Sequence, residues 1–277
     1  MKTYPLKIND PRTGYTVTVL SASKVVVSGG KLGDKPQNVS TLLGKGDANP
    51  KTAKNIVVTK GLSLAAHKLS GFNVCAFAKT CIRSCIGVHS GKGSEENVQR
   101  ARIAKTVVYY LARPWFLAKL NKELHLFRKA YPLDVKIGVR LNMFSDIPWE
   151  HHNIMGNHPN IEFYDYSKNP RRAGQLRSNY WVTFSYDGTN LEHALKILSE
   201  GGNVSAVFYN QGDHRKCGKY AHEQTIPTEF KGYPVIDGGK TDWRPDDPRG
   251  TWVGLRLLAR TYNSRNDAIA DGFAISC

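Results

Sequence analysis

The sequence predicts an α/β protein whose core is a partial or distorted (β/α) barrel with mostly parallel strands, preceded by an N-terminal β-rich extension. From residue 134 onward, short strand patterns alternate with helical connections, which favours parallel pairing and right-handed crossovers. These strands are short and apolar, as in sheets buried on both faces. About six such units fall short of the eight in a closed barrel. Residues 1–50 are instead rich in Gly, Lys, Asn and Ser.

We assign the extension and its loop to residues 1–54 and the barrel domain to residues 55–277. The extension contains two short stretches of strand-forming residues separated by serines, which is typical of neighbouring strands. A stretch containing Gly, Asn and Pro then predicts a loop. The elements expected in this region are strands at 15–20, 24–27 and 56–58, the loop at 43–54 and a helical turn at 63–68.

A helix is predicted from Ser94 to about residue 113. Ser94 is a favourable N-cap, and the two glutamates that follow it suit the positive end of a helix. Pro114 either kinks this helix or begins a second one at its first position, which would end near Ala130.

The rest of the chain repeats the strand–connection pattern. A helix at 191–200 is closed by two glycines, which commonly terminate helices. The predicted strands are 134–141, 161–167, 180–185, 204–209, 235–237 and 252–258, with a short helix at 148–155 and a basic connection at 170–177.

The composition of the 277-residue chain is that of an ordinary globular protein, with 40% hydrophobic and 22% charged residues, which excludes wholesale disorder. No apolar run approaches the roughly 20 residues of a membrane span, so we expect no membrane partner. The N-terminus lacks the apolar region of a secretory signal. We therefore expect a cytoplasmic protein, or one in the host cytoplasm if the protein is viral.

Lys and Arg outnumber Asp and Glu by 39 to 23, for a net charge of +16. A surplus of this size attracts polyanions, of which nucleic acid is the obvious candidate. The alternative is a solvated surface that serves only solubility. A nucleic-acid patch would use basic residues of the predicted helix and of the basic connection, namely Arg100, Arg102, Lys105, Arg171, Arg172 and Arg177.

The five cysteines are an odd number, which argues against a disulfide framework. Cys75, Cys81 and Cys85 follow a C-x5-C-x3-C spacing, and a loop this short can wrap its thiolates around one [4Fe-4S] cluster. The fourth iron needs a ligand from elsewhere. Cys217, just beyond the fourth predicted barrel strand, is the candidate. Cys277 is the last residue, and we expect it to be held less rigidly.

Zinc is the alternative metal. Adding His89 to the three cysteines produces a Cys3His set whose C-x3-H ending resembles the CCCH fingers of RNA-binding proteins, although the first spacing is shorter than in that family. The thiols could also simply be buried, as free cysteines often are. Three cysteines on a loop containing Gly, Ser and Lys are nevertheless unlike a core.

Polar residues lie on or just after the predicted strands, where the C-terminal ends of parallel strands meet at one mouth. Arg140 and Asn142 share one strand face because side chains alternate along a strand. Such residues either bind a ligand, for example a small anion at Arg140, or fill the barrel as an ion pair of the Arg140–Asp165 type. The candidate pocket residues are Arg140, Asn142, Asp146, Asp165, Lys168, Ser185 and Asp237.

Several segments, taken in order, resemble the gene-product-88 family of bacteriophage proteins. The resemblance spans most of residues 40–258 and is carried by the order of the segments rather than by a single motif. The matching segments are GDANPKT at 46–52, the three-cysteine loop, the helix from Asn97, the strand ending at 140–146, FYDYSK at 163–168, DGGKTD at 237–242 and DPRG at 247–250.

A barrel with a cysteine loop after an early strand is also similar to radical S-adenosylmethionine enzymes. Those enzymes use C-x3-C-x2-C and leave one iron open for the cofactor. Here the spacing differs, no Gly-Gly-Glu-like motif follows, and Cys217 as a fourth ligand would close the open iron. The similarity therefore implies a related fold rather than radical chemistry.

We expect a phage iron–sulfur protein that binds one [4Fe-4S] cluster and acts with a redox partner in electron transfer or redox chemistry. On this interpretation it is derived from a radical S-adenosylmethionine enzyme. The alternative is a nucleic-acid-binding protein stabilised by the Cys3His zinc site or by the cluster. The sequence leaves both catalysis and pure electron carriage open.

Overall fold

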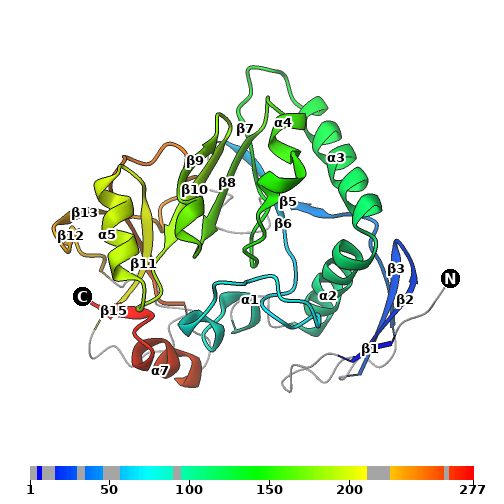
Figure 1. Ribbon diagram of the computed structural model, residues 1–277, viewed down its shortest axis with the longest axis horizontal. Coiled ribbons are helices and arrows are strands. Elements are labelled where there is room, and N and C mark those ends of the chain that lie inside the picture. The colour runs from blue at the N-terminus through cyan, green and yellow to red at the C-terminus, as the bar shows by residue number, and fades with distance from the viewer. Residues whose placement is uncertain are drawn as a thin grey trace.

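The computed structural model describes residues 5–7, 16–29, 35–45, 57–89, 95–210, 225–258 and 262–277. Its main feature is a large mixed sheet, shown in Figure 1. In chain order its strands are β5 (Leu43–Lys45), β6 (Val58–Leu62), β7 (Ile137–Arg140), β8 (Glu162–Ser167), β9 (Gly174–Arg177), β10 (Tyr180–Ser185), β11 (Val204–Tyr209), β12 (Glu229–Phe230), β13 (Tyr233–Asp237), β14 (Trp252–Arg256) and β15 (Ala274–Ser276).

The strands of this sheet lie in the order β12-β13-β14-β11-β10-β8-β7-β6-β5. Every neighbouring pair from β13 to β6 is parallel, whereas β5 and β12 add antiparallel edges. Two more strands join on the side: β9 pairs antiparallel with β10, and β15 pairs parallel with β11. The prediction of a mixed α/β fold with a mostly parallel sheet is confirmed.

The longer helices are α2 (Glu96–Leu111), α3 (Arg113–Lys129), α5 (Leu191–Ser199) and α7 (Tyr262–Ala270). α2 and α3 are separate helices that meet at Ala112, and Pro114 lies in the first turn of α3, as the second-helix alternative predicted. Pro is tolerated there because backbone N–H groups in the first turn of a helix have no hydrogen-bond acceptor within the helix, so the N–H that Pro lacks is not needed. α2 begins after Glu95, and the predicted cap Ser94 lies outside the described residues.

The helices bury the core against one face of the sheet. Ile103 and Val107 of α2 and Leu120 of α3 belong to the same buried cluster as Ile137 and Val139 of β7. A second buried cluster joins α5 to β10, β11 and β14. The opposite face of β7 is covered by Trp243, because a Cβ built on Gly138 would lie 2.3 Å from its ring.

The N-terminal region forms its own four-stranded antiparallel sheet, with strands β1 (Pro5–Lys7), β2 (Thr16–Ser21), β3 (Lys24–Ser28) and β4 (Lys35–Asn38) in that order. Alternation along β2 and β3 buries Val17, Val25 and Val27, which belong to the cluster shared with α2 and α3. The small sheet therefore packs on the main body through α2 (Figure 1).

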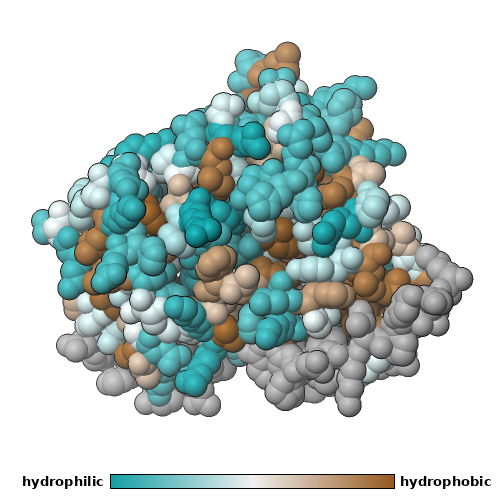
Figure 2. Space-filling view, in the orientation of Figure 1, coloured by the Kyte–Doolittle hydropathy of each residue, from teal (hydrophilic) through white to brown (hydrophobic). Residues whose placement is uncertain are grey.

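Short helical turns fill the connections. They are η3 (Thr80–Ile82), α1 (Ile86–His89), η5 (Trp149–His152), α4 (Ile154–Asn157) and η6 (Pro170–Arg172). None of the helices in the described part of the chain is long and apolar enough to cross a membrane. The face in Figure 2 is largely hydrophilic, with hydrophobic residues in small separate groups.

Candidate functional site

The three-cysteine loop leaves the C-terminal end of β6 and runs to α1. It is held in a series of turns, including hydrogen bonds from Ala78 N to Cys75 O (3.1 Å) and from His89 N to Cys85 O (2.8 Å). The loop also contacts distant parts of the chain, because Thr80 Oγ1 donates to the carbonyl of Asp187 and Arg83 pairs with Asp271. These contacts place the loop across the C-terminal side of the sheet.

The side chains of Cys75, Cys81 and Cys85 are all half-buried. Burial raises the pKa of the Cys75 thiol to about 12, and the negative charges of Cys85, Asp146 and Cys81 raise this pKa further. The three thiols therefore lie within electrostatic range of one another. No three His, Cys, Asp or Glu side chains of the described residues are gathered closely enough to hold a single metal ion.

Arg102 of α2 lies behind this loop. Its Nη1 donates to Gly87 O at 2.8 Å, and its guanidinium stacks 4.0 Å from the centre of the Phe144 ring. Burial lowers the pKa of Arg102 to about 10, while the charge of Cys85 acts in the opposite direction. Gly87 must be glycine here, because a Cβ would lie 2.9 Å from the Phe144 ring. A buried cation thus faces the thiol loop.

The structure describes two of the three other candidate metal ligands. Cys217 lies outside the described residues. His89 is in α1, one turn after Cys85, which is the position that the zinc alternative requires. Cys277 is exposed, but its backbone N–H donates to Tyr209 O at 3.0 Å after β15 pairs with β11. The backbone of Cys277 is therefore held by the sheet, while its side chain is exposed.

Asn142 and Asp165, two of the candidate pocket residues, are buried and bonded to each other. Asp165 accepts hydrogen bonds from Asn142 N (2.7 Å) and from Tyr180 Oη (3.0 Å). Asn142 Oδ1 accepts from Ser145 Oγ, Ile147 N and Trp149 Nε1. This network is internally satisfied and shapes the turn after β7.

Asp146 belongs to a second internal network, centred on Arg172. The Arg172 guanidinium pairs with Asp146 at 2.6 Å and with Glu150 at 2.7 Å, and it donates to Tyr180 Oη at 2.9 Å. Asp146 also accepts from Ser167 Oγ and from Lys168 N. The network ties the loop after β7 to β8 and β10.

Arg140 faces the other side of the sheet and pairs with Asp242 at 3.2 Å, not with Asp165. The expected Arg140–Asp165 pair is wrong in its partner, because Arg140 and Gly138 share the sheet face that residues 242–243 cover, whereas Asp165 bonds to Asn142 and Tyr180. Arg140 also lies 4.5 Å from the centre of the Tyr166 ring.

The remaining candidate pocket residues contact different partners and do not form one site. Lys168 Nζ lies 5.6 Å from the Phe273 ring centre, and Ser185 Oγ accepts from Ser205 Oγ at 3.3 Å. Asp237 forms a two-bond ion pair with Arg256 (2.5 and 2.9 Å), and the hydrogen bonds from Arg256 lower its pKa. This pair lines a pocket of about 520 Å³ beside β13.

The predicted polyanion patch is wrong for those of its residues that the structure buries. Arg100 is fully buried and donates to Val27 O (2.6 Å) and Gly29 O, and Arg172 is buried in the network described above. Lys105 Nζ donates to Leu42 O at 2.9 Å. The side chains of these cations make contacts inside the protein. Of the six residues of the predicted patch, only Arg171 and Arg177 are exposed.

Two residues, Arg102 and Asp242, have roles in the structure that the sequence did not predict. Arg102 was assigned to a surface patch, although it lies behind the cysteine loop. Asp242 was not considered as the partner of Arg140. Both contacts join segments far apart in the chain, and no local spacing signals them; the only hint was the charged residue itself within a mostly apolar element.

Comparison with known families supports the resemblance drawn from the ordered segments. The family model described as gene product 88 matches residues 37–271. No curated protein and no solved structure matches the chain, so the similarity to radical S-adenosylmethionine enzymes gains no support from these comparisons. Since this family model matches most of the length of the chain, the chain belongs to the gene product 88 family.

Proposed function

We propose that this protein is an iron–sulfur protein that holds one [4Fe-4S] cluster through Cys75, Cys81, Cys85 and Cys217. Such a cluster supplies one-electron transfer when bound, so the protein would act in electron transfer or redox chemistry. The observation that carries the proposal is the grouping of three half-buried thiols on one loop with a buried cation behind them.

The donor set fits a cluster better than a single ion. In a [4Fe-4S] cluster each thiolate binds a different iron atom, so the sulfurs surround the cluster and need not meet at one point. A structural zinc ion requires four ligands that converge on one centre at about 2.0–2.3 Å. The described thiols act on one another electrostatically, and a cluster whose ligands bind different irons accommodates thiols that are near each other without meeting at one point.

Arg102 supports the same proposal through its charge. A cluster bound by four thiolates is anionic, and a buried cation nearby offsets part of that charge. No carboxylate pairs with Arg102 in the described residues, so its charge is available to the thiol loop. The Phe144 ring and the Gly87 carbonyl hold the guanidinium in place.

We further propose that the parallel sheet curves as a partial barrel, with the cysteine loop at the C-terminal mouth. The loop follows β6, the first of the parallel strands along the chain, and it contacts the turns after β10 and α7. This arrangement is what a fold related to radical S-adenosylmethionine enzymes would predict.

Anaerobic purification with iron and sulfide analysis tests the proposal. We expect a brown protein with broad absorbance near 400 nm and about four iron and four sulfide per chain. Separate Cys75→Ser, Cys81→Ser and Cys85→Ser variants should each lose most of the iron. A colourless protein with stoichiometric zinc that is lost in His89→Ala would establish the zinc alternative instead.

The fourth ligand is tested by a matched pair of cysteine variants. Cys217→Ala should leave three thiolates, and the cluster should then lose iron and give a [3Fe-4S] signal in electron paramagnetic resonance. Cys277→Ala removes the other remaining thiol, which is exposed, and should retain the wild-type spectrum. Unchanged iron and spectrum in Cys217→Ala would refute this ligand assignment.

A further inference from the structure

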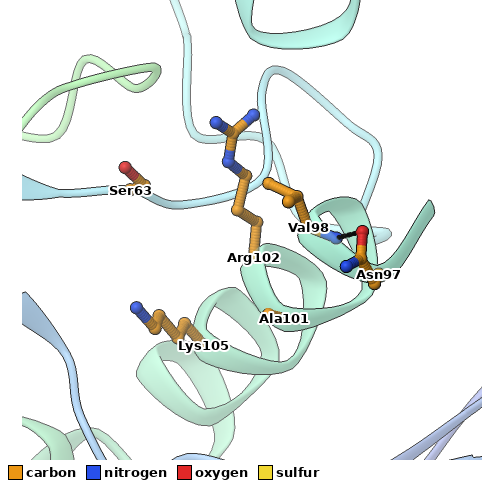
Figure 3. Close-up of a pocket in the computed structure, with 6 residues that line it drawn as sticks. All are labelled: Ser63, Asn97, Val98, Ala101, Arg102 and Lys105. Carbon is orange, nitrogen blue, oxygen red and sulfur yellow. Dashed lines mark hydrogen bonds between the residues drawn. The ribbon is translucent and has the colours of Figure 1, made fainter. Parts of the chain in front are cut away.

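A pocket of about 370 Å³ lies on α2, beside the residue that follows β6 (Figure 3). Its volume is within the range of small-molecule sites and exceeds what a bare inorganic ion fills. Figure 3 shows Arg102 and Lys105 rising from α2 towards the segment that carries Ser63. The lining residues are Ser63, Asn97, Val98, Ala101, Arg102 and Lys105.

Among the described residues that line this pocket, the two charged ones are both cations. Arg102 is only 8% exposed, and its Nε has no hydrogen-bond partner within the described residues. The Nε is closed off from solvent, so Arg102 contributes to the pocket through its charge rather than through this donor. Arg102 Nη1 is already used by Gly87 O, which holds the guanidinium in position.

The carboxylate of Glu123 acts electrostatically on Lys105, but it is also bound by other groups. Glu123 accepts hydrogen bonds from the backbone N–H groups of Leu42 and Leu43 at 2.9–3.0 Å and pairs with Lys119 at 3.3 Å. Lys105 itself donates to Leu42 O. The ammonium can therefore donate further hydrogen bonds to an anion in the pocket.

The remaining walls provide neutral donors and an apolar surface. The side-chain oxygen of Asn97 accepts from Val98 N at 2.8 Å, which leaves the amide nitrogen as a donor, and Ser63 offers a hydroxyl. Asn97, Val98 and Ala101 lie in the first two turns of α2. Val98 and Ala101 can contact the carbon skeleton of a ligand.

We propose that this pocket binds the phosphate group of a small organic phosphate, with Arg102 and Lys105 as its charge partners. Two cations match a dianion, and a guanidinium fork suits phosphate oxygens. The cations line a pocket rather than an exposed ridge, which favours a small molecule over a nucleic-acid backbone. The site uses none of the cysteines and goes beyond the proposed cluster, although Arg102 lines this pocket and also lies behind the thiol loop.

Binding is measured by isothermal titration calorimetry with two probes, inorganic phosphate and ribose 5-phosphate. Ribose and sodium chloride at matched ionic strength are the controls. We expect saturable binding of ribose 5-phosphate that is tighter than that of inorganic phosphate, and no saturable binding of ribose. Failure of both phosphates to bind, preference for the bare ion, or binding of polymeric nucleic acid alone would each overturn the proposal.

Two substitutions at one exposed position separate charge from shape. Ala101→Glu places a carboxylate in the pocket and four residues before Lys105, where the two side chains would pair along the helix. We expect the affinity for ribose 5-phosphate to fall about tenfold or more, the size expected of one added charge a few ångströms away. Ala101→Gln has nearly the same shape as Ala101→Glu without the charge, so it should bind ribose 5-phosphate about tenfold or more tightly than Ala101→Glu does.

Both variants should fold, because Glu and Gln are good helix formers at an exposed position. Equal affinity of Ala101→Glu and Ala101→Gln would overturn the proposal. Iron content is measured in the same samples, so a failure of the phosphate site is distinguished from a failure of the cluster proposal.

Discussion

The carboxylate of Asp165 is fully buried between Asn142 and Tyr180. Burial raises its pKa from 3.8 to about 7, although the charges of Arg140 and Arg172 and the hydrogen bond from Asn142 N oppose this. The folded protein therefore binds a proton at Asp165 more tightly than the unfolded chain does. This group stabilises the fold fully below its unfolded pKa, and the contribution is lost as the pH rises through about 7.

We predict that the free energy of unfolding of wild type, measured relative to Asp165→Asn, falls as the pH rises from 3.8 to about 7. The asparagine cannot ionise, so the difference between the two proteins isolates the titration of this carboxylate. Urea unfolding across that pH range measures it. A constant difference would contradict the raised pKa, and a difference that grows with pH would show that the donors outweigh burial.

At the scale of elements, Arg172 of η6 joins four parts of the chain. It contacts Glu150 of η5, Tyr180 of β10, Ser167 of β8 and Asp146 in the loop after β7. Replacing a buried arginine leaves its carboxylate partners uncompensated, which is the costly way to break an ion pair. The relative positions of these elements therefore depend on one side chain.

We predict that Arg172→Met lowers the free energy of unfolding by about 3–5 kcal/mol, as expected for a broken buried pair. The neighbouring Arg171 is exposed, and Arg171→Met should change it by no more than about 0.5 kcal/mol. Denaturant unfolding of both variants at neutral pH is the measurement. Similar losses in the two variants would show that the Arg172 network contributes little to stability.

The elements also show where local patterns suffice. The break between α2 and α3 follows from Pro114, whose ring is tolerated only in a first turn of a helix, and β8, β10 and β11 follow from runs of apolar and aromatic residues. The loop expected at 43–54 is wrong at its start, where β5 pairs with β6, and α7 and β15 are among the elements that the sequence did not predict. α7 is largely polar, and β15 is three residues long and is stabilised by pairing with β11.

On the scale of the whole molecule, the net charge of +16 remains the basis of the nucleic-acid alternative. Burial removes Arg100 and Arg172 from any such surface, so the remaining attraction is spread over exposed cations such as Arg171 and Arg177. Diffuse charge produces binding that is sequence-independent and depends steeply on salt.

We predict that duplex DNA binds weakly at low salt and is largely released by about 200 mM sodium chloride, because binding is driven by counterion release. Fluorescence anisotropy with two unrelated duplexes of equal length should yield the same affinity for both. Arg171→Gln with Arg177→Gln should lower the affinity and flatten the salt dependence. Absence of binding at low salt would remove the nucleic-acid alternative.

The sequence by itself determined the mixed α/β class with a mostly parallel sheet, the family, and the position of three cysteines on one loop, because each can be recognised from local patterns and their order along the chain. Hydrophobic periodicity specifies strands and helices locally, and the C-x5-C-x3-C spacing brings Cys75, Cys81 and Cys85 onto one loop. The order of the short segments was enough to indicate the gene product 88 family, which the match over residues 37–271 confirms.

Only the tertiary structure decided which charges meet. Arg140 pairs with Asp242, Arg172 with Asp146 and Glu150, and Arg102 lies behind Cys85. These partners of Arg140 and Arg172 lie 22 to 102 residues away from them along the chain. A charged side chain can reach any opposite charge that the fold brings near, and chain spacing does not encode that choice. Burial then turned expected pocket and surface residues into internal supports, because a charge removed from water must find a partner inside the protein.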